Sequence, residues 1–160
     1  MEWKPRIVSL SEKKLIGKKI RMSLEANQTY ELWRSFMPER GKINNTISSD
    51  LLSIRVYDKP MEPSNRQQQF DKWAAVEVED FDEIPDRMEA FVLKDGLYAV
   101  FDYQGLSTDN KIFIYIFRDW LPGSEYELDQ RPQFEVLGEK FKNNDPGSQE
   151  EIWIPIKPKY

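Results

Sequence analysis

The sequence predicts an α+β domain that contains one module twice, with an antiparallel sheet and two helices flanking a central cleft. Residues 33–38 and 117–122 both read aromatic, arginine, polar, aromatic, apolar, proline, and they close on Pro38 and Pro122. A tryptophan in a strand-like run follows each copy, Trp73 after the first and Trp153 after the second, so that the two spacings nearly agree. The order of the elements around these words also repeats, which favours a duplication over chance.

The first half predicts two strands, a helix and two more strands. Tyr30, Trp33 and Met37 recur at the spacing of one helical face, and Pro38 with Gly41 ends the helix. The elements expected here are strands at residues 5–10, 14–24, 51–57 and 73–78 and a helix at residues 28–40.

The second half is expected to repeat this order. Residues 111–121 have strand propensity, but Phe113, Ile116 and Trp120 also fall on helical spacing, and correspondence with the first half favours a helix. Residues 94–96 end in Asp-Gly and predict a hairpin. The other expected elements are strands at residues 90–93, 97–103, 133–137 and 151–156.

At 160 residues the chain is expected to form a single domain, residues 1–160, with internal repeats at about residues 5–80 and 87–158. Each half reads strand, strand, helix, strand, strand. Two such modules side by side place a cleft along their pseudo-twofold axis.

Composition excludes several classes of function. A net charge of -5 without a basic stripe argues against direct nucleic-acid binding. The absence of Cys and His removes thiolates and the commonest metal ligand and general base, so carboxylates, Lys and Tyr remain and no cofactor or metal is expected. No apolar run approaches the length of a membrane span and no signal peptide is evident, so we expect a cytoplasmic protein without membrane contact.

Glu135 is the leading candidate for chemistry. It interrupts an apolar strand and, by alternation, lies on the face opposite Phe134 and Val136. The alternative is an outward-facing carboxylate on a half-exposed strand. In the last strand, Trp153 shares a face with Glu151, where it is either covered by a loop or forms a platform for a ligand.

The aromatic residues of the two predicted helices have two interpretations as well. Their spacing is typical of core packing, but both helices border the cleft and an open cleft would be lined by them. These residues are Trp33, Phe36, Tyr115 and Trp120.

Five ordered motifs resemble the GyrI-like effector-binding domain family, which includes the DNA gyrase inhibitory protein and the ligand domains of regulators such as Rob and BmrR. The resemblance covers nearly the whole chain and implies a pseudo-twofold pair of β-α-β-β units. The motifs are Leu32-Trp33-x-x-Phe36-Met37-Pro38, Gly96-Leu97-Tyr98-Ala99-Val100-Phe101, Asp119-Trp120-Leu121-Pro122-Gly123-Ser124-x-Tyr126-Glu127-Leu128, Arg131-Pro132-x-Phe134-Glu135 and Ile152-x-Ile154-Pro155-Ile156.

The resemblance also implies a function. Regulators of this family hold flat, aromatic, often cationic compounds between the two helices, above a glutamate and between aromatic walls. Glu135 matches that glutamate, and Trp153 and Glu151 resemble wall residues, whereas the helix aromatics match more loosely. No helix-turn-helix segment is present, so the chain resembles the stand-alone members, and we expect a sensor or sink for lipophilic cations.

Two other functions stay open. Some proteins of similar fold are hydrolases that open strained electrophilic rings, and a desolvated Glu135 could serve as their general acid or base. A protein-interaction role like that of the gyrase inhibitor would use the surface instead, for which the acidic connector at residues 77–86 is the candidate; no protein partner can be named.

Overall fold

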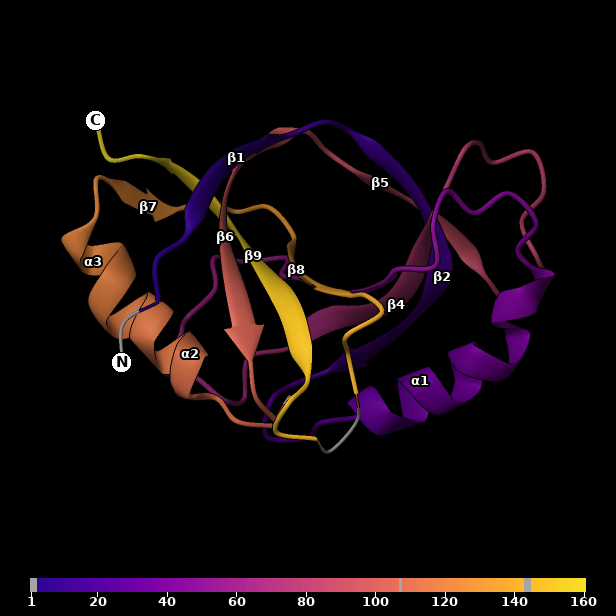
Figure 1. The fold of residues 1–160 in the computed structure, drawn as a ribbon, viewed down its shortest axis with the longest axis horizontal. Coiled ribbons are helices and arrows are strands. Elements are labelled where there is room, and N and C mark those ends of the chain that lie inside the picture. Colours follow the sequence, from indigo (N-terminus) through magenta and orange to yellow (C-terminus); the bar gives the residue numbers. More distant parts are fainter. Residues whose placement is uncertain (1–2, 107, 143–144) are drawn as a thin grey trace.

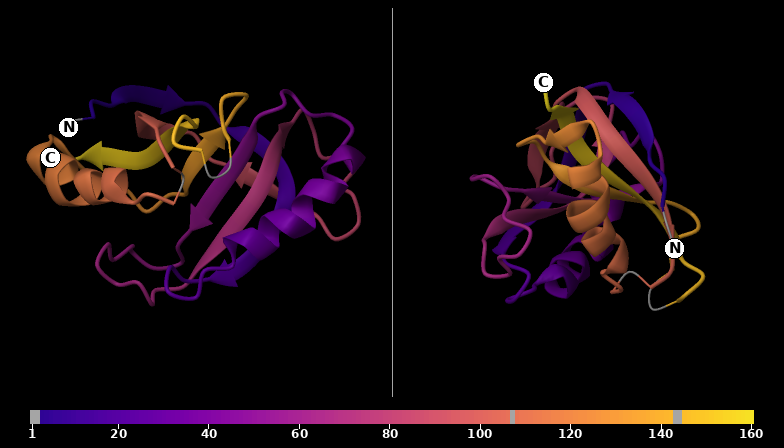
Figure 2. Two further views of the ribbon diagram at one scale, coloured as in Figure 1. Left: turned by 60° about the horizontal axis from the view of Figure 1, so that its bottom comes forward. Right: turned by 90° about the vertical axis from the view of Figure 1, so that its left-hand side faces the viewer.

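The computed structural model describes residues 3–106, 108–142 and 145–160 and confirms the α+β class. Over these residues, nine strands form one antiparallel sheet in the order β1-β6-β9-β8-β3-β4-β2-β5, with β7 paired to β9 (Figures 1 and 2). None of the helices described is long and apolar enough to cross a membrane.

The first module has the predicted order. The α-helix stops at Phe36 because Pro38 follows, and the chain tightens there into a 3₁₀ helix. Its elements are β1 (Arg6–Leu10), β2 (Lys13–Met22), α1 (Thr29–Phe36), η1 (Met37–Lys42), β3 (Leu51–Val56) and β4 (Phe70–Val78).

The second module confirms the helix at the ambiguous segment. Three consecutive pieces form it, and the middle one, η2, is a π-helix, an irregularity that is frequent at functional sites. The short strand β7 was not predicted. The elements are β5 (Glu89–Leu93), β6 (Gly96–Gln104), α2 (Lys111–Ile114), η2 (Tyr115–Trp120), α3 (Leu121–Gly123), β7 (Tyr126–Leu128), β8 (Gln133–Leu137) and β9 (Gln149–Pro158).

The strand order is a palindrome of equivalent strands, which places the pseudo-twofold axis between β3 and β8. Ile54 in β3 lies opposite Phe134 in β8. On its other side, Ile54 lies opposite Trp73 in β4, and Phe134 lies opposite Trp153 in β9. The sequence offset between Trp73 and Trp153 therefore relates β3 to β8 and β4 to β9. Residues equivalent in the two modules meet at the centre of the sheet.

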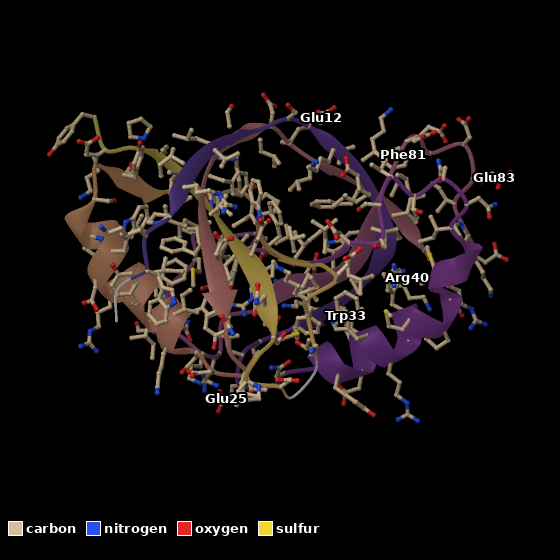
Figure 3. The ribbon with its side chains drawn as sticks, in the orientation of Figure 1. Glu12, Glu25, Trp33, Arg40, Phe81 and Glu83 are labelled. Atoms are coloured by element: carbon tan, nitrogen blue, oxygen red, sulfur yellow. The ribbon has the colours of Figure 1, made fainter. Side chains whose placement is uncertain are left out.

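The predicted hairpin at residues 94–96 is wrong. β5 pairs with β2 and β6 pairs with β1, and one antiparallel register continues from the Leu10–Gly96 pair to the Lys13–Leu93 pair. β1–β2 and β5–β6 are thus two long bent strands that form a single ribbon joining the two ends of the sheet, with its bend near Glu12 (Figures 1 and 3). The Asp-Gly step between β5 and β6 therefore lies at this bend. It does not form a hairpin, because β5 and β6 pair with β2 and β1 and not with each other.

The two faces of the sheet have different cover. On the helix face, α1 packs over β2 and β4, and the α2–α3 helix packs over β6 and β9. The opposite, inner face is enclosed by the bent ribbon and holds a continuous apolar core that includes Trp73, Tyr98 and Phe134. In sheet order, β8 and β3 lie between β9 and β4, so the centre of the helix face lies between the two helices.

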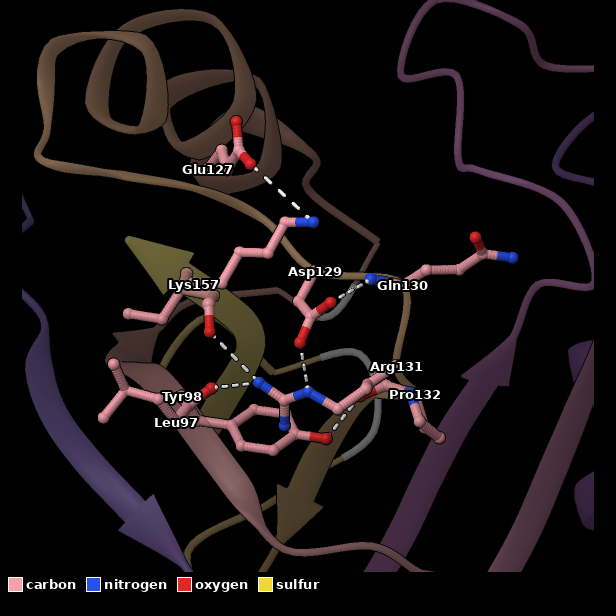
Figure 4. A network of polar contacts seen from close by, with 9 residues as sticks. Leu97, Tyr98, Glu127, Asp129, Gln130, Arg131, Pro132 and Lys157 are labelled. Atoms are coloured by element: carbon pink, nitrogen blue, oxygen red, sulfur yellow. Dashed lines mark hydrogen bonds and ion pairs between the residues drawn. The ribbon is translucent and has the colours of Figure 1, made fainter. Parts of the chain in front are cut away.

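Arg131 fixes the start of β8 (Figure 4). Its Nη2 donates to the carbonyls of Leu97 at 2.6 Å and Ile156 at 3.1 Å, and its Nε donates to Asp129 at 2.6 Å. Gly96, at φ +152°, leaves room for it, since a Cβ there would lie 2.3 Å from the guanidinium. These bonds tie β8, which carries Glu135, to β6 and β9.

Candidate functional site

The centre of the helix face is polar, although apolar residues surround it. Alternation places Lys72 of β4, Ser53 and Arg55 of β3, and Glu135 of β8 on this face. Ser53 lies between Ala74 and Glu135 in adjacent strands, and both Ser53 and Ala74 are buried. Their small side chains form a floor above which the longer charged side chains converge.

Two carboxyl groups meet at this floor. Glu150 of β9 shares its face with Ile152, which pairs with Glu135, so the two glutamates are diagonal neighbours on adjacent strands. Glu150 is 8% exposed, and burial raises its pKa to about 10, with further contributions from the charge of Glu135 and a hydrogen bond with it. Glu150 therefore keeps its proton near neutral pH, next to the carboxyl group of the partly exposed Glu135.

A lysine lies on the same buried face. Lys72 alternates with Phe70, Ala74 and Val76, all of which are buried, and is itself 4% exposed. Burial lowers its pKa to about 8; the charge of Arg55 adds to this shift, and the carboxyl groups of Glu135 and Glu150 oppose it. Within the described residues, its ammonium forms no ion pair with a carboxylate.

Arg55 completes the charged group and links the modules. Its guanidinium carbon lies 5.2 Å from the centre of the Phe113 ring in α2 and 5.7 Å from that of Phe70 in β4. Both contacts are cation–π interactions, in which the positive group faces the electron-rich ring. The site thus already holds a cation against an aromatic wall.

A small cavity of about 10 Å³ lies at this site, which is room for about one water molecule. Because this volume is so small, a larger molecule can enter only if side chains of the lining, such as Arg55 and Phe113, move. Its lining comprises Ser53, Arg55, Phe113, Gln133, Phe134, Glu135, Ile152, Trp153 and Ile154. In the part of the chain described, no three acidic side chains gather in a way that would hold a metal ion.

The two site residues predicted for the last strand lie on the opposite face of the sheet from Glu135. Trp153 and Glu151 alternate with Ile152 and so point to the inner face, where the Trp153 ring stacks on Phe134 at 5.1 Å and 18°. The Trp153 Nε1 donates to Glu151 at 3.1 Å, and Arg6 pairs with the same carboxylate. Trp153 borders the cavity, but its indole belongs to the inner core.

The four helix aromatics pack mainly in the two helix-covered cores. Phe36 is fully buried under α1, and Trp33, on the side of α1 turned toward the sheet in Figure 3, meets it edge-on at 5.9 Å. Trp120 meets Phe101 edge-on at 5.2 Å, and Tyr115 lies 5.5 Å from Trp3. None of these four borders the cavity described above, and the helix residue that does is Phe113.

Sequence reasoning missed Lys72, Arg55, Glu150 and Phe113. A usable signal existed for two of them, because Lys72 and Glu150 occupy alternating positions whose other members are apolar. A charged residue in the register of a buried strand face marks either a partner or a site. Arg55 and Phe113 carry no such signal, since their meeting depends on how α2 crosses β3.

Comparisons with known proteins agree with this fold. The family model for Cass2, described as an integron-associated effector binding protein, matches residues 6–156. The integron cassette protein VCH_CASS2 of Vibrio cholerae has a TM-score of 0.68 at 14% identity, over 96% of each chain. SAV2435 bound to tetraphenylphosphonium gives 0.67 at 18% identity, over 98% of this chain and 94% of that one. The EcmrR C-terminal domain gives 0.72 at 14% identity, over 99% of each.

No curated protein sequence matches the chain significantly. At these identities the solved structures establish the fold, and the molecules named with them belong to those proteins. The family model carries more, because it covers nearly the whole chain and agrees with the motifs that resemble GyrI-like domains. The chain belongs to the Cass2 family of integron-associated effector-binding proteins, a GyrI-like family.

Proposed function

We propose that this protein binds a flat, lipophilic, cationic aromatic molecule between α1 and α2, with the Glu135–Glu150 pair as its counter-charge. The observation that carries the proposal is the pair itself, because Glu150 is buried and neither carboxyl group forms an ion pair with a cation among the described residues. A carboxyl group on this largely apolar face has no cationic partner there, and a ligand cation would supply one.

The aromatic side of the site supports the same ligand class. Phe113 and Phe70 already hold the guanidinium of Arg55, and each cation–π contact is worth about 0.5–2 kcal/mol. A ligand that displaces Arg55 would meet both rings and the carboxylate. Because stacking and one charge require little exact geometry, specificity would be broad, as suits a multidrug sensor or sink. The tetraphenylphosphonium bound to SAV2435 is likewise a lipophilic aromatic cation, although its four rings are arranged tetrahedrally and not in one plane.

The test is a calorimetric titration with tetraphenylphosphonium at pH 7, using wild type, Glu135→Gln and Glu151→Gln. Glu151 is the matched control, since it lies on the neighbouring strand but on the opposite face. We expect Glu135→Gln to weaken binding at least tenfold and Glu151→Gln to change it less than twofold. Neutral triphenylphosphine oxide should bind equally to all three.

Several results would contradict the proposal. Absence of saturable binding would reject the ligand class, and equal loss of the neutral and the charged ligand would reject the role of charge. A loss with Glu151→Gln as large as with Glu135→Gln would restore the wall position that the family resemblance implies for Glu151.

A hydrolase is the second candidate, because one feature favours it specifically. Burial raises the pKa of Glu150, so that a protonated carboxyl group lies beside the carboxyl group of Glu135, and two neighbouring carboxyl groups could serve as general acid and general base. Ring opening of an aryl epoxide would then stop in both Glu135→Gln and Glu150→Gln. Turnover that persists in either variant would exclude this mechanism.

A further inference from the structure

Lys72 lies where a bound cation would compete with it. Its ammonium and any ligand cation held by Glu135 interact with the same carboxyl pair. The charged groups that face Lys72 are Arg55 from β3, Glu135 from β8 and Glu150 from β9, while its partner in β2, Ile20, is uncharged. Arg55 cannot relieve the competition by losing a proton, because a guanidinium stays charged at all accessible pH values.

Lys72 is able to relieve this competition by losing its proton. It is fully enclosed, it forms no hydrogen bond or ion pair among the described residues, and its pKa is about 8. Its charged form still predominates at pH 7, but it is far less favoured than that of an ordinary lysine. A second positive charge beside Glu135 lowers the proton affinity of the amine further, because like charges repel.

We propose that Lys72 is the resident cation of this site and that it passes its proton to solvent when a cationic ligand binds. This inference rests on the proposed function. It makes Lys72 a specificity-determining residue, which favours neutral over cationic ligands at low pH and admits cations as pH rises. Proton binding and cation binding then oppose each other to the same extent in both directions.

The size of the effect follows from the fraction of protein that is ready to bind. With a pKa of about 8, roughly one Lys72 in eleven is neutral at pH 7, and the apparent Kd is the intrinsic Kd divided by that fraction. The affinity for tetraphenylphosphonium should thus rise roughly tenfold between pH 7 and pH 9 in wild type. Glu150 stays protonated over most of this range, since its pKa is about 10.

The experiment is calorimetry with tetraphenylphosphonium from pH 6.5 to pH 9, repeated at pH 7 in phosphate and Tris, whose ionisation enthalpies differ. Wild type should release nearly one proton for each ligand bound at pH 7. Lys72→Met keeps the shape of the side chain without the charge, and should bind roughly tenfold more tightly at pH 7, release no proton and lose the pH dependence. Lys19→Met is the matched control, on the neighbouring strand and exposed, and should behave as wild type.

The outcomes separate this inference from the proposed function. If neither wild type nor Lys72→Met binds the cation at any pH, both fail. If wild type binds without proton release, or Lys72→Met binds no more tightly at pH 7, the proposed function stands and the role of Lys72 is rejected. The wild-type pH series gives this answer even if Lys72→Met does not fold.

Discussion

The two modules have the same order of sheet strands and opposite charges at the centre of the sheet. Through the offset that relates Trp73 to Trp153, Arg55 in β3 is equivalent to Glu135 in β8, and Lys72 in β4 to Ile152 in β9. Glu150 in β9 is equivalent to Phe70. The first module thus contributes the two cations of the site and the second contributes the two carboxyl groups.

This difference shows what a duplicated fold must change. Because the pseudo-twofold axis passes between β3 and β8, equivalent residues on the helix face become near neighbours. An ionised residue retained in both copies would face its own charge, and like charges on neighbouring strands are destabilising. Divergence of Arg55 and Glu135 turns that repulsion into attraction and at the same time makes a site that neither module could form alone.

The largest expected effect comes from making the modules alike. Glu135→Arg places a third cation beside Arg55 and Lys72 and leaves Glu150 without its partner, which should reduce the free energy of unfolding by about 2–4 kcal/mol. Urea denaturation at pH 7 measures it. The exchange variant Arg55→Glu with Glu135→Arg restores opposite charges and should recover at least half of the loss; no recovery would show that local packing rather than charge governs these positions.

An effect of at most the same size is expected from Glu150, through the pH dependence of stability. Its pKa is about 10 in the folded state and near 4.5 when unfolded, so between these values the folded state holds one proton more and its stability falls as pH rises. From pH 5 to pH 8 wild type should lose about 2–4 kcal/mol relative to Glu150→Gln, which has no proton to lose. The titration of Lys72 changes the stability only above about pH 8. Parallel stability curves for the two proteins would contradict the buried carboxyl pair.

The smallest effect is expected on the inner face, away from the axis. Arg6 pairs with Asp102 at 2.6 Å and with Glu151 at 3.1 Å, and all three side chains are substantially exposed. Arg6→Gln should cost less than about 1 kcal/mol in thermal or urea unfolding, because solvent screens such pairs. Binding of tetraphenylphosphonium should not change. A larger loss would mean that the ends of the ribbon depend on charge as the centre does.

Much of the fold followed from local pattern. The helical spacing of Trp33 and Met37 and the equivalent place of Trp73 and Trp153 were enough to predict two modules and a pseudo-twofold axis. Alternation also placed Glu135 opposite Phe134, as the structure confirms. These predictions hold because strand and helix periodicity depend only on neighbours in the sequence.

The site required information that neighbours in the sequence do not contain. Lys72 and Glu135 come close to each other because their strands, β4 and β8, both pair with β3. The periodicity of a sequence does not show which strands are adjacent in the sheet. The Asp-Gly step at residues 95–96 misled for the same reason, since its turn propensity is real but the strands that flank it find partners in the other module. Trp153 lines the cavity although alternation puts its ring on the inner face, and its role as a ligand wall stays a prediction.

The bent ribbon has a consequence for how the protein assembles. β1 of the first module completes the sheet beside β6 of the second, and β5 of the second completes it beside β2 of the first. Each module thus contributes one strand to the part of the sheet formed by the other module, as in a domain swap within a single chain. Neither half is therefore a folding unit of its own. Although the sequence and the symmetry show two modules, we expect the protein to unfold in one cooperative transition and not in two.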